Sequence, residues 1–333
     1  MAGETIEREP DATPRFSLER LPVDTETLLG IGTILPVIVL YLIISIIPVL
    51  FAIYASFHQI PLLNPEWTWI GLDNYGEVLS GLPALVEALS TEGLSTLAQG
   101  GFWRSLVRGV LFMVGSTLLQ LVVGLWMALT LNRIARFQKV ATAVVFTAYL
   151  VPTIVISLLA VFMFDTFYGV FHEMGSQWLN LWGDSTFALG QKGLAMPIVI
   201  LVGSWKFSVF ITIFTLAQLR AIPERFYEAA RVCGANKWEM FRDVTLPRIQ
   251  GVILVAVLLR SIFMFNKFDL IWILTQGGPG YATTTLPVLA YREAFEASNY
   301  GAANAMAVVM FVFLAFGAIG YFKAFNPSDE VET

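Results

Sequence analysis

Charged side chains stand inside two long apolar runs of this sequence of 333 residues. Lys206 lies within residues 194–219, and Lys267 and Asp269 lie within residues 251–275. In a bilayer, a charged side chain at the centre of a helix costs about 2.5 to 3.5 kcal/mol on insertion scales. Such side chains therefore face an interior cavity or pair with one another, and they mark the path of a polar ligand.

Aromatic and amide side chains stand next to these charges, as in many ligand sites. Trp205 and Phe207 flank Lys206, and Asn266 precedes Lys267. We interpret six residues as candidates to line a ligand pathway: Trp205, Lys206, Phe207, Asn266, Lys267 and Asp269.

Two alternatives stand beside this interpretation. Lys267 and Asp269 can pair in a purely structural role, and Lys206 can extend outward to the membrane surface along its apolar stem. Arg260 lies in the same run as Lys267, nearer the cytoplasmic end of the predicted span, and is interpreted as structural. The charges alone leave open whether a ligand is neutral or anionic.

The composition indicates a lipid environment. Hydrophobic residues make up 56% of the chain and charged residues 14%, whereas about a quarter of the residues of soluble domains are charged. A transmembrane helix needs about 20 mainly apolar residues. We therefore predict an all-α integral membrane protein with six crossings, at residues 28–57, 109–131, 140–164, 194–219, 251–275 and 302–322.

Positive charge sets the predicted orientation, because loops rich in Lys and Arg stay on the cytoplasmic side. Such residues are frequent in the N-terminal tail at residues 1–27 and in the loop at residues 220–250. We expect one transmembrane domain, residues 28–325, with cytoplasmic tails at residues 1–27 and 326–333. The first tail lacks the pattern of a removable signal peptide, so we expect the first span to remain in the mature protein.

The loop at residues 220–250 contains start and stop signals that predict a helix, a turn and a second helix. Pro223 suits the first position of the first helix. Gly234 stands where a left-handed cap ends that helix.

The second helix of the loop has its own start and stop signals. Asn236 followed by Glu239 predicts an N-cap with a capping-box partner. We expect this helix to reach about Val244, because Pro247 cannot extend it.

The first loop helix carries a narrow face of small residues. Phe226, Ala230 and Cys233 recur at helical spacing, with Ala229 beside them. Such a face allows close approach of another protein, for which Glu228 offers a polar anchor. The alternative is an amphipathic helix that lies on the membrane surface.

The sequence gives no sign of catalysis by this chain. No GxxxxGK[ST] phosphate loop occurs in it. His58 and His172 are the only histidines and Cys233 is the only cysteine, which argues against a metal or nucleophile cluster. We expect no catalytic, cofactor-binding or metal-binding residue.

The loop resembles a known motif. Residues 228–230 (Glu-Ala-Ala), Gly234 and residues 244–247 (Val-Thr-Leu-Pro) are spaced as in the EAA loop of the membrane subunits of binding-protein-dependent ABC importers. Cys233 departs from the acidic residue often found before the glycine, which leaves a local polar contact in doubt.

Further segments resemble the sugar permeases of the maltose and glycerol-phosphate type. They are WIGLDNY at residues 69–75, LNR at 131–133, YLVPTIV at 149–155 and FDLIWILTQGGPGYATTTLPVLAYREAF at 268–295. The likeness covers nearly all of residues 28–325, without the extra N-terminal helices or large external domain of the maltose member.

The resemblance implies the type I ABC importer permease (MetI-like) fold, six transmembrane helices with a cytoplasmic coupling helix. It implies that the loop docks on an ATPase subunit through Phe226, Glu228, Ala229, Ala230 and Gly234. The implied partners are a second permease subunit in a heterodimer, two ATPase subunits that hold ATP and Mg, an external solute-binding protein, a sugar and the lipid bilayer, with no nucleic acid.

The resemblance thus implies a permease of an ATP-driven carbohydrate importer in the cell membrane of a bacterium or archaeon, working by alternating access. In that setting Trp and Phe rings of the pathway candidates would stack on sugar faces, and Asn and Asp would bond hydroxyl groups. An ion-coupled secondary transporter of small polar solutes is the alternative, and a membrane-embedded enzyme is a third hypothesis.

Overall fold

The computed structural model describes residues 25–61, 66–91, 93–134, 137–183 and 186–325. Within these ranges the chain is almost entirely helical, which confirms the all-α prediction. The strands described are β1 (His58–Gln59) and β2 (Thr68–Trp69), which pair antiparallel. Of the predicted tails, residues 1–24 and 326–333 lie outside the described residues.

The chain divides into two compact units, residues 1–51 and 52–333. The first contains α1 (Thr25–Tyr41) and the π-helical segment η2 (Leu42–Ile46), and α2 (Ile47–Ala55) crosses the boundary. Residues Leu29–Ala55 form a helix long and apolar enough to cross a membrane. The predicted first span is therefore one continuous helical segment.

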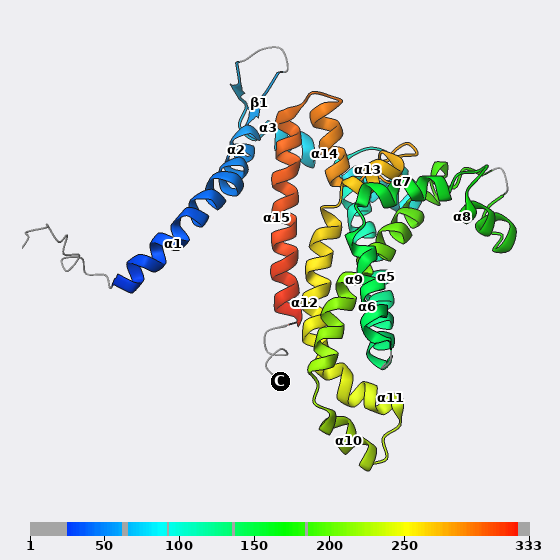
Figure 1. The fold of residues 1–333 in the computed structure, drawn as a ribbon. Coiled ribbons are helices and arrows are strands. Elements are labelled where there is room, and N and C mark those ends of the chain that lie inside the picture. The colour runs from blue at the N-terminus through cyan, green and yellow to red at the C-terminus, as the bar shows by residue number, and fades with distance from the viewer. Residues whose placement is uncertain (1–24, 62–65, 92, 135–136, 184–185, 326–333) are drawn as a thin grey trace, which may run out of the picture. The chain divides into compact units, whose positions relative to one another are not determined.

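The second unit is built around four long helices that lie side by side (Figure 1). They are α5 (Phe102–Arg133), α9 (Ala195–Ala221), α12 (Leu246–Phe265) and α15 (Tyr300–Phe325). α5 lies against α9 along its length, and α12 contacts both. The close approach of α5 and α9 needs Gly124, because a Cβ atom there would stand 2.8 Å from the carbonyl oxygen of Ser208.

The third predicted span is broken. α6 (Gln138–Leu150) and α7 (Thr153–Met163) meet at an angle of 89°. The break lies at Val151 and Pro152. A proline removes a backbone donor and keeps the residue before it out of the helical region, so Val151 is extended. The described residues thus hold five helices that can cross a membrane, or six if this bent pair is one span.

The fifth predicted span, residues 251–275, is also interrupted. α12 ends at Phe265, and after a turn the short helix α13 (Asp269–Thr275) begins. Gln276 and Gly277 then take left-handed conformations before the chain enters α14 (Leu286–Phe295). The interruption places Asn266, Lys267 and Asp269 at helix ends rather than inside a helix.

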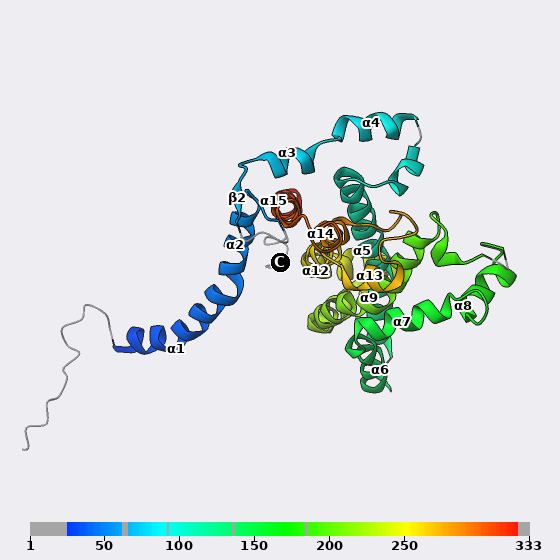
Figure 2. The ribbon, with the colours of Figure 1, turned by 90° about the horizontal axis from the view of Figure 1, so that it is seen from above.

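Shorter elements complete the second unit. Around one side of the bundle, seen end on in Figure 2, run α3 (Asp73–Leu79) and α4 (Leu82–Thr91). The others are the 3-10 turns η3 (Gly93–Ala98) and η5 (Ala188–Gly190), helix α8 (Val170–Glu173) and the π-helical turn η4 (Met174–Trp178). The loop helices α10 (Glu224–Val232) and α11 (Lys237–Glu239) lie at the end of the bundle away from α13 and α14 (Figure 1).

Candidate coupling loop and ligand cavity

The first loop helix, α10, ends as its sequence predicts. Gly234 has a φ of +79°, a left-handed conformation that costs glycine little. The amide of Ala235 donates to the carbonyl of Ala230 at 3.0 Å, which satisfies a carbonyl at the end of the helix. Pro223 stands one residue earlier than predicted, at the N-cap with extended backbone.

The second loop helix begins with the predicted capping box. The Asn236 side chain accepts hydrogen bonds from the amides of Trp238 and Glu239, at 2.9 and 3.1 Å. The Glu239 carboxylate accepts from the amide of Asn236 at 2.7 Å. Both halves of the box are therefore present, and they fix where the helix starts.

The predicted end of this helix is wrong. Instead of stopping near Val244, the chain passes through a π-helical segment, η6 (Met240–Thr245), directly into α12. The amide of Leu246 donates to the carbonyl of Phe241, five residues back. This wider turn relieves the conflict between a proline ring and the carbonyl four residues before it, so Pro247 fits in the first turn of α12.

One consequence is mechanical. Residues Lys237–Phe265 form a single helix of 29 residues that starts in the loop and reaches into the bundle. It links the loop to the bundle through one continuous run of helical backbone hydrogen bonds.

α10 is held against its own chain on one side and open on the other. Phe226 is half-buried against a cluster that includes Leu219 and Ile249, and the Arg248 guanidinium lies 3.8 Å from its ring centroid. Tyr227 shares a hydrogen bond of 3.1 Å with Thr245. These contacts tie α10 to the helix that becomes α12.

Of the residues predicted to dock, Phe226 is half-buried and packs partly against residues of this chain. Ala230 is half-buried, whereas Glu228, Ala229, Cys233 and Gly234 are exposed. α10 contains no buried residue, and Val232 is 89% exposed. The open face carries the residues of the EAA motif.

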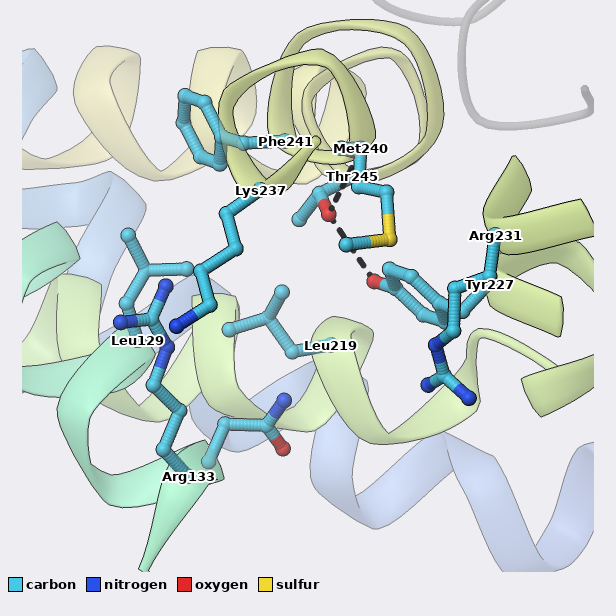
Figure 3. Close-up of a pocket in the computed structure, with 10 residues that line it drawn as sticks. Leu129, Arg133, Leu219, Tyr227, Arg231, Lys237, Met240, Phe241 and Thr245 are labelled. Atoms are coloured by element: carbon cyan, nitrogen blue, oxygen red, sulfur yellow. Dashed lines mark hydrogen bonds between the residues drawn. The ribbon is translucent and has the colours of Figure 1, made fainter. Parts of the chain in front are cut away.

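A cleft of about 370 Å³ lies beneath α10. Figure 3 shows Lys237 and Arg133 ending near each other and Arg231 on the opposite side, with Tyr227 directed toward Thr245. The basic residues from which the cytoplasmic orientation of the loop was predicted thus lie together at this end of the bundle.

A second cavity, of about 480 Å³, opens where α12 ends. Its walls come from α6, α9, α12, the turn that follows α12 and the first residue of α13. The lining residues are Tyr149, Phe207, Arg260, Phe263, Met264, Asn266, Lys267, Phe268 and Asp269. Four of the six predicted pathway residues are thus brought together: Phe207, Asn266, Lys267 and Asp269.

Charge in this cavity is partly paired. The Lys267 ammonium lies 2.8 Å from the Asp269 carboxylate, and it also lies 4.7 Å from the centroid of the Phe207 ring. Asn266 is exposed, and its side-chain nitrogen donates to the carbonyl of Ile262 at 3.0 Å. Its side-chain oxygen takes no part in this hydrogen bond. The cavity therefore presents both donors and acceptors.

The other two predicted residues lie elsewhere. Trp205 is 58% exposed on the opposite side of α9 from buried Phe207 and does not line the cavity. Lys206 is buried, and its ammonium donates to the carbonyl of Val151 at 2.6 Å and to the Thr153 hydroxyl at 3.0 Å. It stabilises the break between α6 and α7 instead of extending outward, because a carbonyl at a helix end lacks a partner in its own helix.

Sequence reasoning missed the other five lining residues, and two of these five, Tyr149 and Arg260, carry polar groups. Tyr149 lies in the YLVPTIV motif, but no local signal aims it at the cavity. Arg260 could have been found, because it is a charged residue inside a predicted span, but the sequence analysis interpreted it as structural.

These features define a class of protein: a multi-pass helical membrane protein with a cavity at the end of α12 that charged, amide and aromatic residues line, and an exposed helix on a loop at one end. The profile of the family described as "Binding-protein-dependent transport system inner membrane component" matches residues 120–328. The chain belongs to this family. It is a transporter subunit, the membrane component of a binding-protein-dependent transport system.

Curated relatives extend the match over most of the chain. The "Trehalose/maltose transport system permease protein MalF" of Thermococcus litoralis is 33% identical over 299 residues, covering 90% of this chain and 94% of that protein. The "Sulfoquinovosyl glycerol transport system permease protein SmoG" of Agrobacterium fabrum is 29% identical over 306 residues, covering 91% and 92%.

A solved structure shares the fold. It is described as "a bacterial ABC transporter involved in the import of the acidic polysaccharide alginate" and superposes with a TM-score of 0.69 at 24% identity, covering 90% of this chain and 96% of that one. The resemblance to ABC importer permeases of the sugar-permease group and the fold that it implies are confirmed.

The contacts of α10 with α12 lead to a prediction. Phe226→Ala removes the ring beneath Arg248, and the loss of about 1 to 2 kcal/mol of packing frees α10 to open locally. Hydrogen exchange of the amides of α10 should then be faster by about tenfold or more. Val232→Ala is the matched control, because that side chain is almost fully exposed on the same helix. Equal exchange in the two variants would contradict the anchoring role.

Proposed function

We propose that this chain is a permease subunit of an ATP-driven carbohydrate importer, and that the open face of α10 docks on a separate ATPase subunit. The observation that carries the proposal is α10 itself. Its Glu228 and Ala229 are exposed while Phe226 and Tyr227 fix it to the helix that continues into the bundle. Glu228 then supplies the polar contact with the ATPase, and Ala229 and Gly234 allow close approach.

The substrate class follows from the relatives and the cavity. Permeases for trehalose/maltose and for sulfoquinovosyl glycerol are similar to this chain along nearly all of its length. The cavity at the end of α12 combines aromatic rings with hydrogen-bonding groups, which suits a molecule rich in hydroxyl groups. We assign Phe207, Asn266, Lys267 and Asp269 to the pathway of a carbohydrate.

The complete transporter, in this proposal, contains a second permease subunit that makes a heterodimer with this chain, two ATPase subunits and an external binding protein. ATP and Mg bind the ATPase subunits. Closure of the two ATPases moves α10 and, with it, α12, and the cavity is exposed to each side of the cell membrane in turn. Both termini lie in the cytoplasm.

Uptake measurements test the energy source. In proteoliposomes that contain the complex, with ATP inside and every ion gradient abolished, we expect radiolabelled sugar to accumulate, because ATP hydrolysis drives the cycle. A complex with Ala229→Trp should lose most of this uptake, because the bulky ring on the open face blocks docking. Lys139→Trp, an exposed position on α6, is the control. Uptake that needs an ion gradient and ignores ATP would favour a secondary transporter instead.

Labelling of the Cys233 thiol tests both the orientation of the loop and the docking of α10. Cys233 is the only cysteine in the sequence and is exposed beside α10. A membrane-impermeant maleimide should label it in inside-out vesicles and leave it unlabelled in right-side-out vesicles. Assembly with the ATPase subunits should slow the labelling, because docking covers the open face. Cys233→Ser gives the background signal. Labelling from the outside would place the loop on the wrong side for any ATPase.

A further inference from the structure

The cleft beneath α10 gathers positive charge from three elements. Arg133 is the last residue of α5, Arg231 stands on α10 and Lys237 is the first residue of α11. Arg133 and Lys237 end near each other, although like charges repel (Figure 3). The described residues that line the cleft include no Asp or Glu. Among the residues that the structure describes, no salt bridge involves Arg133 or Lys237, so these two cations lack an anion.

Other basic residues of the same loop have partners in this chain. Arg242 forms a salt bridge of 2.7 Å with Asp243. The Arg248 guanidinium lies against the Phe226 ring and donates to the carbonyl of Val244 at 2.8 Å. The cleft differs from these places, because its cations converge on a space without a counter-ion.

Arg231 adds charge from the opposite side of the cleft (Figure 3). Its guanidinium lies 4.0 Å from the Glu224 carboxylate, and the two side chains are 58% and 77% exposed. So long and so exposed an ion pair contributes little, because water screens it. Arg231 therefore remains available to a second anion. Guanidinium and ammonium groups that meet from two sides form a typical phosphate site.

The surroundings of the cleft favour the phosphate group of a lipid. Its wall also contains the apolar side chains of Leu129, Leu219, Met240 and Phe241. α5 and α9, each long and apolar enough to cross a membrane, end beside it. Lipid headgroups lie at the ends of such spans, and basic pockets between the helices there bind anionic headgroups. The cations then meet the phosphate while the apolar wall meets the acyl chains.

The proposed docking of an ATPase leaves this cleft open. Tyr227 and Arg231 are four positions apart, so they lie on one face of α10, and both line the cleft. Ala229 stands two positions from each of them, about 200° around the helix. An ATPase seated over Ala229 therefore approaches α10 from the side opposite the cleft.

We propose that the cleft binds a phosphate-bearing anion, with Arg133 and Lys237 on one side of the phosphate and Arg231 on the other, and that this phosphate is the headgroup of an anionic phospholipid. The bound headgroup joins α5 to both loop helices, because it attracts cations from all three. It also relieves the repulsion between Arg133 and Lys237. The site goes beyond the proposed function and does not depend on which solute the transporter carries.

Photo-cross-linking in nanodiscs tests the site in the assembled complex. The bilayer is phosphatidylcholine with increasing fractions of phosphatidylglycerol that carries a photoreactive headgroup. We expect labelling of the peptides that contain Arg133 and Lys237. Arg133→Gln combined with Lys237→Gln should raise the lipid fraction at half-maximal labelling about 10- to 30-fold, because each cation near an anionic lipid contributes a similar favourable amount.

Matched variants separate this site from general attraction to a basic surface. Arg220→Gln combined with Arg242→Gln removes the same charge from exposed positions outside the cleft. Labelling in this control should match that of the wild type. Arg133→Lys combined with Lys237→Arg keeps both charges and should also retain the labelling.

A second arm asks whether a soluble molecule supplies the phosphate. The probe is radiolabelled inorganic phosphate, added to the complex in pure phosphatidylcholine, where the ATPase sites contribute equally in every variant. If the Gln variant of Arg133 and Lys237 loses phosphate binding, the control keeps it and no lipid is labelled, the site is retained and its lipid source is overturned.

Three results would overturn the site itself. One is equal labelling in the two double Gln variants, and another is no difference between them with either probe. The third is loss of assembly when Arg133 and Lys237 are replaced by Gln while the control assembles, which would make the two cations structural. Failure of sugar uptake would overturn the proposed function and leave the lipid result standing.

Discussion

The unbroken helix from Lys237 to Phe265 is the constraint on which the rest of the structure depends. It begins at a capping box in the loop and ends at the wall of the cavity. The π-helical turn η6 makes the continuity possible, because it admits Pro247 without a break. The contacts of Phe226 with Arg248 and of Tyr227 with Thr245 fasten α10 to this helix. α10 is therefore attached to a helix that continues without a break to the wall of the cavity.

Polar groups inside the bundle divide into those that build it and those that remain available. Arg108 joins three segments through carbonyl groups, and Lys206 stabilises the break at Pro152. Both are satisfied by this chain. In the part of the chain that the structure describes, Nη2 of Arg260 and Nε2 of Gln120 have no hydrogen-bond partner.

The sequence predicted best what depends on neighbouring residues. The cap at Gly234 and the box at Asn236 are local, and both are confirmed. The end of the second loop helix was predicted wrongly, because the sequence shows Pro247 but not the wider turn that accommodates it. Six spans were predicted from apolar runs, and the described residues hold five helices that can cross a membrane, or six if the pair bent at Pro152 is one span.

The ligand pathway was harder to predict, because adjacent residues on a helix face different directions. Trp205 and Phe207 are two positions apart, and only Phe207 reaches the cavity. Lys206 and Arg260 are both charges inside spans, and no rule of sequence tells which one finds partners within its own chain. That difference comes from the placement of Val151 and Thr153 beside Lys206, far away in the sequence.

The central claim is that α12 carries the motion of the loop, and one variant addresses it directly. Replacing Arg242 and Asp243, which are exposed and form a salt bridge of 2.7 Å with each other, by two glycines would soften η6 without removing a packed side chain. The measurement is the number of sugar molecules taken up for each ATP hydrolysed by the reconstituted complex. The account predicts that the ATPase subunits still bind and hydrolyse ATP while uptake for each ATP falls severalfold. An unchanged ratio in a fully assembled complex would contradict it.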